Sequence, residues 1–315
     1  MKKITFAKHL PFLITLFCAV NFGFGQACVF SDDFNRADNT VIGSGWTEFG
    51  DRASIISNEL VMESNGVKAR DFVYQDVSGL YNTQLKSLSK IMTWSFNMQQ
   101  TRNGTNGPSG FISGYYGVAF ILGGTNSDFT LGDGYAVVLG ETGPIDYVRL
   151  VRYTNGLINN NLTSFINGTV DFDTEHLSIK VTYDPTTDTW ELFVRNDGTT
   201  FADPSTLVAA DSQGTLVDAT FTSSNLDYVG MFWNHNNTLE LPTPSATFDN
   251  VFIGSITTWT AGAWDNGLPT NNTNVVIADN YDTATYGSFS GCSLTVNTGF
   301  TLAINDVDNG ALSNT

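Results

Sequence analysis

The chain is 315 residues long and carries 31 acidic against 14 basic side chains, a formal net charge of −17 at pH 7. This excess of negative charge speaks against nucleic acid as a partner, because phosphate binding requires a basic surface. Only 14% of the residues are charged, whereas 41% are hydrophobic and 13% aromatic. The chain can therefore bury a substantial core, and its length fits one large or two modest domains.

The segment 1–26 is typical of a secretory signal peptide. Lysines at the start are followed by an apolar run from Leu10 to Val20 and by small residues around a cleavage position near Gly25 or Gln26. The run is too short to span a bilayer, and no later stretch approaches the roughly 20 apolar residues of a membrane helix. We therefore expect a secreted or cell-surface protein without a transmembrane segment.

Two cysteines, Cys28 and Cys292, remain after removal of this signal. A disulfide between them is chemically allowed outside the cell, but the sequence does not decide whether they pair. Cys28 also follows the signal closely enough to suggest a lipid anchor, although the residues before it match a lipoprotein signal poorly.

From residue 29 onward the hydrophobic pattern has a period of two, which indicates β-strands. Residues 177–183 alternate in this way, and residues 190–194 follow across a turn at 184–188, which predicts a hairpin. Further segments with the pattern of strands are 53–62, 91–99, 116–122, 134–139, 147–153, 228–233 and 246–253. Turn signals such as Asn-Gly separate them. The sequence therefore predicts an all-β fold, an antiparallel sandwich or barrel.

The pattern changes near Ser255. Residues 255–315 contain Trp259 and Trp264, followed by short strand-like segments at 275–278, 293–296 and 301–304. So few strands are marginal as an independent unit. We interpret residues 27–254 as a β-sandwich domain and residues 255–315 as the start of a second small β module, in a chain that is an incomplete piece of a longer protein.

Several short motifs resemble a known superfamily when they are taken in order. They are Asp32-Asp-Phe-Asn-Arg36 with Gly45-Trp46, Asn58-Glu-Leu-Val-Met62, Gly117–Leu122 with Gly132–Val137, Trp190-Glu-Leu-Phe-Val194 and Phe248–Ile253. This order resembles the concanavalin A-like lectin/glucanase superfamily in its laminin-G-like form, which implies a jelly-roll β-sandwich over residues 29–254. The tail around Trp259 and Trp264 is similar to modules of large bacterial surface proteins exported by the type IX secretion system, which implies the bacterial outer surface.

Three aspartates suggest a calcium site. Asp32 and Asp33 lie in the first expected strand and Asp249 in the last, so they would be neighbours if the two terminal strands pair. Calcium takes six to eight oxygen ligands, which carboxylates and backbone carbonyls supply. The arrangement resembles the structural calcium site of some sugar-binding jelly rolls. The alternative is that one aspartate caps a turn and the others face solvent.

Candidate sugar-binding residues are Tyr115, Tyr116, Trp233, His235 and Asn236, at the start of one expected strand and the end of another. Aromatic rings pack against the apolar faces of sugars, and planar polar side chains bond to their hydroxyl groups. The alternative is that Tyr116 and Trp233 belong to the core, as most strand aromatics do.

A catalytic alternative rests on Asp171, Asp173 and Glu175. Retaining glucanases of the resembled fold place carboxylates at alternate positions of one strand, so that all of them point at the substrate. The spacing matches, but Asp171 stands where that family has its nucleophilic Glu, and Asn167-Gly168 just before it indicates a turn. Histidines and cysteines show no metal-ligand spacing, and Gly-x-Ser-x-Gly is absent.

These observations favour a secreted, non-catalytic module that binds a polysaccharide, a glycan or another surface ligand and acts in adhesion as part of a multidomain cell-surface protein. A glycoside hydrolase on the same fold and a structural spacer without a ligand stay open as alternatives, because one fold hosts many functions.

Overall fold

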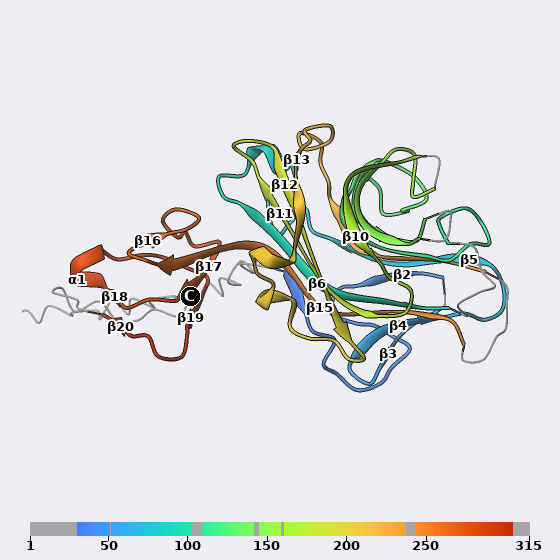
Figure 1. The fold of residues 1–315 in the computed structure, drawn as a ribbon, viewed down its shortest axis with the longest axis horizontal. Coiled ribbons are helices and arrows are strands. Elements are labelled where there is room, and N and C mark those ends of the chain that lie inside the picture. Colours follow the sequence, from blue (N-terminus) through green and yellow to red (C-terminus); the bar gives the residue numbers. More distant parts are fainter. Residues whose placement is uncertain are drawn as a thin grey trace, which may run out of the picture.

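A computed structural model describes residues 30–50, 52–102, 109–141, 145–158, 161–236 and 243–304. The expected signal peptide and Cys28 lie outside these residues. The described chain forms two facing β-sheets and a narrower extension, which we call the tail (residues 255–304) and which lies to the left in Figure 1. Among the described residues, no helix has the length and apolarity needed to cross a membrane.

The larger sheet is antiparallel throughout its sandwich part. Its strands follow the order β13 (Ser212–Val217), β12 (Thr189–Gly198), β11 (His176–Asp184), β6 (Met92–Thr101) and β15 (Ser245–Thr260). Short strands complete it at β15, namely β1 (Phe30–Asp32), β4 (Glu59–Glu63) and, paired with β4, β3 (Ala53–Ile56). The chain's first and last sandwich strands, β1 and β15, therefore lie side by side.

The smaller sheet has seven strands, all antiparallel. Their order is β10 (Leu162–Asp171), β9 (Tyr147–Tyr153), β8 (Gly134–Leu139), β7 (Gly117–Gly124), β14 (Tyr228–His235), β5 (Ala69–Asp76) and β2 (Thr47–Phe49). Short 3₁₀ turns lie in the connections, namely η1 (Leu85–Ser87), η3 (Pro204–Thr206) and η4 (Ala209–Asp211).

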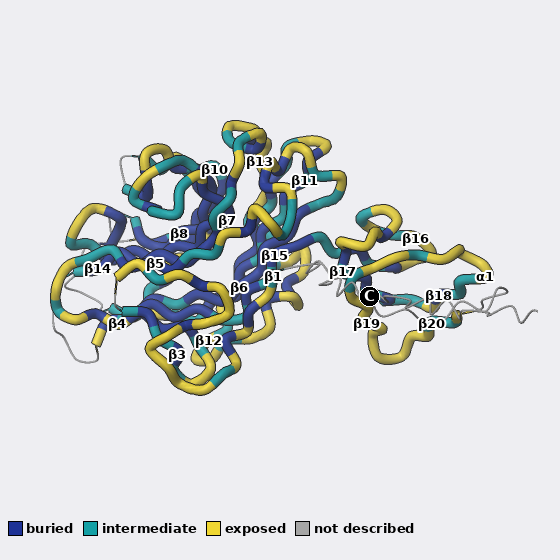
Figure 2. Tube along the Cα trace, turned by 180° about the vertical axis from the view of Figure 1, so that it is seen from behind, coloured by how far each residue is buried: buried dark blue, intermediate teal, exposed yellow. Residues whose placement is uncertain are grey.

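The main core lies between the two sheets, whose strands are coloured largely as buried (Figure 2). Alternate side chains of each strand contribute to it. From the larger sheet it receives Trp94 and Trp190, and from the smaller sheet Phe120 and Trp233, all fully buried. A second cluster, which includes Phe111, covers the other face of the smaller sheet. Both faces of the smaller sheet are therefore apolar, and the predicted antiparallel β-sandwich is confirmed.

The segment 53–62, expected as one strand, is a hairpin of β3 and β4. Ser57 and Asn58 both adopt positive φ, 55° and 67°, and form the tight turn between the two strands. An alternating hydrophobic pattern continues through such a turn, which explains why one strand was expected.

The tail continues directly from β15, which passes the expected boundary at residue 254 without a break. Its second half pairs in parallel with β17 (Thr273–Ile277), and β17 pairs in parallel with β19 (Ser293–Val296). The remaining elements are β16 (Ala263–Trp264), β18 (Tyr281–Asp282), α1 (Thr283–Tyr286) and β20 (Leu302–Ala303). A small core of its own, centred on Trp259, holds the tail together.

Candidate functional site

The expected sugar-binding residues lie at one end of the sandwich, but most of them are buried. Trp233 and His235 are fully buried and Tyr116 is 2% exposed, so these rings belong to the interior and offer no face to a ligand. Tyr115 and Asn236 are half-exposed. The two segments that carry these residues do meet, since Asn234 Nδ2, in β14, donates a 2.9 Å hydrogen bond to the Tyr115 carbonyl.

His235 is held in a buried polar cluster with Asp71 and Ser64. Its Nε2 lies 2.7 Å from Asp71 Oδ2, and its Nδ1 lies 3.4 Å from Ser64 Oγ and 3.1 Å from the Asn236 carbonyl. The trio has the residue types of a hydrolytic triad. The imidazole is fully buried and Ser64 is only 7% exposed, however, which leaves a substrate no approach. The cluster therefore joins β5, β14 and the end of β4 structurally.

The three candidate catalytic carboxylates do not share a strand face. Asp171 ends β10, whereas Asp173 and Glu175 lie in the connection before β11. Each is tied to its own surroundings: Asp171 accepts from the Asp146 amide at 2.7 Å, Asp173 pairs with Arg102 at 2.8 Å, and Glu175 accepts from the Asp173 amide at 2.7 Å. The alternating arrangement expected for a glucanase is thus not formed.

Asp32 has a role other than the expected calcium ligand. Its Oδ1 accepts from the Phe34 amide and from Arg36, and its Oδ2 accepts from Arg36 and from Trp46 Nε1, at 2.7–3.0 Å. Both oxygens thus face donors, which leaves no lone pair directed at a cation. The expected pairing of the terminal strands is nonetheless present, with Asp32 opposite Val251.

The other two aspartates face different surroundings. Asp33 is exposed, whereas Asp249 is half-buried beside Asn250. Burial raises the pKa of Asp249 to about 7, and the negative charges of Glu59, Asp33 and Asp32 add to the shift. Within the described ranges, no three His, Cys, Asp or Glu side chains are grouped so that they could hold a metal ion.

A different feature, a groove of about 900 Å³, crosses the outer face of the larger sheet where the sandwich meets the tail. Its lining comes from β11, β6, β15, β17 and β19, with η3 at one side. Adjacent strands are about 4.8 Å apart, so these five strands span roughly 19 Å. Polar side chains along it include Thr93, Ser95, Thr182, Thr258, Asn274 and Thr295. We call this feature the junction groove.

The floor of the junction groove carries hydroxyl groups that have no hydrogen-bond partner in the described part of the chain. Thr93 is 6% and Ser95 3% exposed, and Thr182 lies opposite Thr93 on the neighbouring strand. Among the described residues, none accepts from or donates to these three hydroxyls. None of the three oxygens is among the described buried polar atoms that lack a partner, so they open onto the groove and can bond to water or to a ligand there.

Apolar and charged groups complete the groove. Phe252 and Ile256 are half-buried and lie beside the hydroxyls, Phe252 directly opposite Ser95. The ionisable residues of the lining are Lys180 and Asp265. Lys180 Nζ is engaged, because it donates to the Leu207 carbonyl at 2.6 Å and lies 4.2 Å from the centre of the Phe193 ring. The lining is thus largely uncharged in a strongly acidic protein.

The groove continues toward β1. A hollow of about 530 Å³ shares Ser95, Ser205, Phe252 and Ile256 with it and leads to Asp33. The groove therefore adjoins a second hollow, which is more charged, since Asp33, Arg36 and Asp203 line it.

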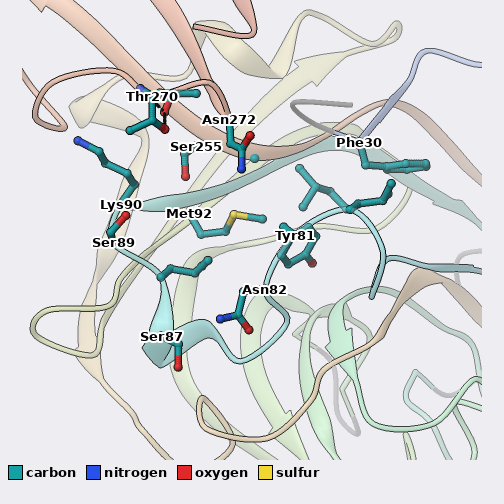
Figure 3. Close-up of a pocket in the computed structure, with 15 residues that line it drawn as sticks. Phe30, Tyr81, Asn82, Ser87, Ser89, Lys90, Met92, Ser255, Thr270 and Asn272 are labelled. Carbon is teal, nitrogen blue, oxygen red and sulfur yellow. Dashed lines mark hydrogen bonds between the residues drawn. The ribbon is translucent and has the colours of Figure 1, made fainter. Parts of the chain in front are cut away.

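A smaller pocket of about 220 Å³ lies at the same junction (Figure 3). Phe30, Tyr81 and Met92 line it from the sandwich, and Thr270 and Asn272 from the tail. It is too small for the 300–1,000 Å³ typical of ligand pockets. Its lining shows instead that tail and sandwich are in contact on this side as well.

Hydrogen bonds fix the tail to the sandwich at this junction. The Asn266 side chain accepts from the Ile91 amide at 3.1 Å and donates to the carbonyls of Ile91, at 3.3 Å, and Ile256, at 2.9 Å. Lys90 Nζ donates to the Asn266 carbonyl at 2.7 Å. Both sides of the junction groove are therefore held in place before a ligand arrives, which reduces the entropy lost on binding.

Replacing Asn266 by alanine tests this junction. The change leaves backbone groups of Ile91 and Ile256 without partners, so we expect the free energy of unfolding to fall by about 1–3 kcal/mol. Asn272→Ala, on the exposed neighbouring loop, is the control and should change it by less than about 0.5 kcal/mol. Urea denaturation measures both variants, and equal losses of stability would argue against the role of Asn266 in fixing the tail to the sandwich.

The half-buried Asp249 predicts a pH dependence of stability. Its pKa is about 7 in the folded protein against an ordinary 3.8, so between pH 4 and 7 the folded state keeps a proton that the unfolded state has lost. Stability therefore falls as the pH rises through this window. Asp249→Asn should be more stable than the wild type at pH 8, by about 1–2 kcal/mol for a partly exposed site, and equal to it at pH 4.

Thermal unfolding at both pH values measures this difference, with Glu63→Gln, an exposed carboxylate that is not among the charges acting on Asp249, as the control. A gain for Asp249→Asn that is equal at pH 4 and pH 8 would contradict the pKa explanation. The same samples test calcium: an ion beside Asp249 would raise the Tm of the wild type and leave that of Asp249→Asn unchanged.

The sequence analysis did not indicate the junction groove, because its residues fall at the outward positions of ordinary alternating strands. A signal was present. The outward positions of β6 are Thr93, Ser95 and Asn97, where an exposed sheet usually carries charged side chains. Which tail residues would lie opposite them depends on the path of β15, and sequence periodicity does not contain that path.

No family model matches the chain, and no curated protein matches it. Similar solved structures include the CBM2 module of an evolved Dit of Lactobacillus casei BL23 phage J-1, at 9% identity and a TM-score of 0.44, covering 71% of this chain and 94% of that chain. The VIP36 exoplasmic/lumenal domain in a Ca²⁺/Man2-bound form has 10% identity and a TM-score of 0.46 (72% and 87% covered). Peanut lectin with a 9mer peptide has 14% identity and a TM-score of 0.43, and the match covers 72% of this chain and 98% of that chain. With TM-scores below 0.5, these likenesses carry no weight for the function of this chain.

Proposed function

We propose that the chain is a secreted, non-catalytic module that binds a carbohydrate chain in the junction groove and acts in adhesion as part of a multidomain cell-surface protein. The observation that carries this proposal is the set of unpartnered hydroxyls of Thr93, Ser95 and Thr182 on the groove floor. Sugar hydroxyl groups both donate and accept hydrogen bonds, as these side chains do.

The apolar part of the groove supports the same ligand class. The ring of Phe252 and the side chain of Ile256 offer apolar surface beside the hydroxyls, which suits the apolar face of a pyranose ring. The volume of about 900 Å³ lies in the range of ligand pockets, and the length of roughly 19 Å across five strands suits several linked sugars. An extended, uncharged glycan therefore fits better than a single small molecule.

The experiment uses the mature chain on a panel of immobilised neutral, acidic and amino polysaccharides, with retention and released reducing ends read on the same samples. Retention on a neutral polysaccharide without new reducing ends is the expected result. Because the lining is largely uncharged, retention should change little between low and high salt. New reducing ends that disappear in Glu175→Gln would favour the hydrolase, and no retention on any glycan would favour the spacer.

Two variants place the binding site. Phe252→Ala removes the apolar surface of the groove and should weaken binding about tenfold, the equivalent of losing roughly 1.4 kcal/mol of contact. Tyr115→Ala changes an aromatic residue of the loop end that was predicted from the sequence and should leave affinity unchanged. Titration of a soluble oligosaccharide from the retained polysaccharide measures both. The opposite pattern would move the site to the loop end.

A further inference from the structure

The hollow beside the junction groove offers a second binding position for the same ligand. Its volume of about 530 Å³ lies in the range of ligand pockets, and it shares with the groove the residues Ser95, Ser205, Phe252 and Ile256. A glycan that lies in the groove and passes these residues therefore reaches the hollow. The two features differ in charge, because largely uncharged side chains line the groove and carboxylates line the hollow.

The net charge of the hollow is negative, because the arginine in its lining is already neutralised. Arg36 donates to both carboxylate oxygens of Asp32, at 2.7 and 3.0 Å, and to the Ile42 carbonyl at 2.8 Å. Asp33 and Asp203 also line the hollow, and among the described residues neither forms an ion pair with a basic side chain. Two uncompensated carboxylates are therefore left in the lining.

Each of these two carboxylates can accept a further hydrogen bond. Asp33 Oδ1 accepts from the Asn35 amide at 3.1 Å, and Asp203 Oδ1 accepts from the Ser205 amide at 2.8 Å. Within the described ranges, no donor is bonded to the Oδ2 atom of either group. Both side chains are exposed, so a ligand in the hollow can reach them.

A buried hydroxyl group marks the place where the groove and the hollow join. Ser95 is 3% exposed. It lies on β6 between the core residues Trp94 and Phe96, so it faces outward, and it lines both features. Its hydroxyl has no hydrogen-bond partner in the described part of the chain, and its oxygen opens onto this space. Ser95 therefore offers a donor and an acceptor to a ligand that passes from the groove into the hollow.

A neighbouring carboxyl group responds to the same excess of negative charge. Asn250 lines the hollow, and the pKa of Asp249 beside it is raised to about 7, mainly by burial and further by the negative charges of Glu59, Asp33 and Asp32. A cationic group is therefore favoured at this end of the groove, and an anionic group is disfavoured.

We propose that the hollow is a subsite for a positively charged amino group, so that the module prefers a glycan with a protonated amino sugar at the unit that passes Ser95. The ammonium group donates to Asp33 and Asp203 while the neighbouring units lie in the junction groove. The inference rests on the proposed function and adds one charged position to the glycan.

A divalent metal ion suits the hollow less well than an ammonium group. Calcium takes six to eight oxygen ligands, and within the described ranges no three His, Cys, Asp or Glu side chains are grouped so that they could hold a metal ion. An ammonium group has only three N–H donors to satisfy. The two carboxylates and the Ser95 hydroxyl supply enough acceptors for them.

The test compares two soluble probes that differ only in charge, namely an oligosaccharide of six glucosamine units and the same oligosaccharide with every amine acetylated. Titration of the mature chain at about pH 6, where the amines are protonated, measures both affinities. In about 20 mM salt the amino form should bind about fivefold more tightly, the size expected for two exposed charge pairs. In about 500 mM salt the difference should fall below about twofold, because the Debye length shortens to roughly 4 Å.

Two variants and a matched control place the effect in the hollow. Asp33→Asn and Asp203→Asn keep the shape of the side chain and remove its charge. Each should lower the preference for the amino form about twofold, and the double variant should abolish it without changing the affinity for the acetylated form. Glu63→Gln removes the same charge from an exposed residue opposite Ser245, at the start of β15, and should leave the preference unchanged.

The remaining outcomes separate this inference from the proposed function. Equal affinities of the two probes would overturn the subsite, and so would a preference that Glu63→Gln lowers as much as Asp33→Asn does. Absence of binding to both probes would overturn it as well. In each case the proposed function is decided separately, by retention on the neutral polysaccharides.

Discussion

Replacing Asp32 by alanine is expected to lower the free energy of unfolding by about 3 kcal/mol, the low end of the range for removing one partner of a buried ion pair, because its partner Arg36 is partly exposed. Asp32 is 8% exposed and accepts hydrogen bonds from Arg36, from Trp46 Nε1 and from the Phe34 amide. Without the carboxylate, the two terminal nitrogens of Arg36 and the indole N–H lose this acceptor, while Arg36 Nε keeps its 2.8 Å bond to the Ile42 carbonyl. The segment between β1 and β2 then keeps its backbone bridge between Asn39 and Ile55 and its buried side chains but loses the polar contacts that fix its start.

The neighbouring residue provides the control for this prediction. Asp33 is exposed and, within the described ranges, accepts only from the Asn35 amide, at 3.1 Å, so Asp33→Ala should change stability by less than about 0.5 kcal/mol. Urea denaturation followed by tryptophan fluorescence measures both variants. Similar effects for the two aspartates, or an Asp32→Ala effect that vanishes when calcium is chelated, would return Asp32 to the role of metal ligand.

Trp190→Ala is expected to have an effect of at least the same size, about 3–5 kcal/mol, from the cavity left by a large aromatic side chain. Trp190 is fully buried, and its ring lies 4.5 Å from the Tyr135 ring and 4.7 Å from the Tyr183 ring. Its Nε1 also donates to the Asp218 carbonyl at 2.9 Å. The indole therefore joins both sheets and the segment after β13.

A second substitution separates the two contributions of this indole. Trp190→Phe keeps most of the packing and loses the hydrogen bond, so its effect should be smaller, about 1–2 kcal/mol. Thermal and urea unfolding give both values. A loss as large for phenylalanine as for alanine would mean that the bond to Asp218 outweighs the packing.

The central strands could be predicted from sequence because their alternation is regular. Residues 177–183 and 190–194 form the predicted hairpin of β11 and β12. β5 and β10 were missed for physical reasons. β5 carries Asp71 at an inward position, where His235 partners it, and β10 contains register shifts that interrupt the alternation. A pattern based on hydrophobicity detects neither a buried polar pair nor a bulge.

The candidate site was less predictable than the fold. Trp233 and Asn236 are close in sequence, yet one is fully buried and the other reaches the surface, because side chains of β14 alternate between the core and the other face of the sheet only until the strand ends at His235. The junction groove forms only where strands that are far apart in the sequence come together, namely β11, β6, β15, β17 and β19. In the sequence, only the uncharged outward residues of β6 indicated this groove.

The passage of β15 through both parts of the molecule has a mechanical consequence. Its first half is bonded to β6 on one side and to β4 and β1 on the other. Its second half pairs in parallel with β17 in the tail (Figure 1). A pulling force applied through the tail would act along the axis of β15. The hydrogen bonds to its neighbours would then be loaded together in shear instead of being opened one after another, so the junction would resist tension better than a flexible linker.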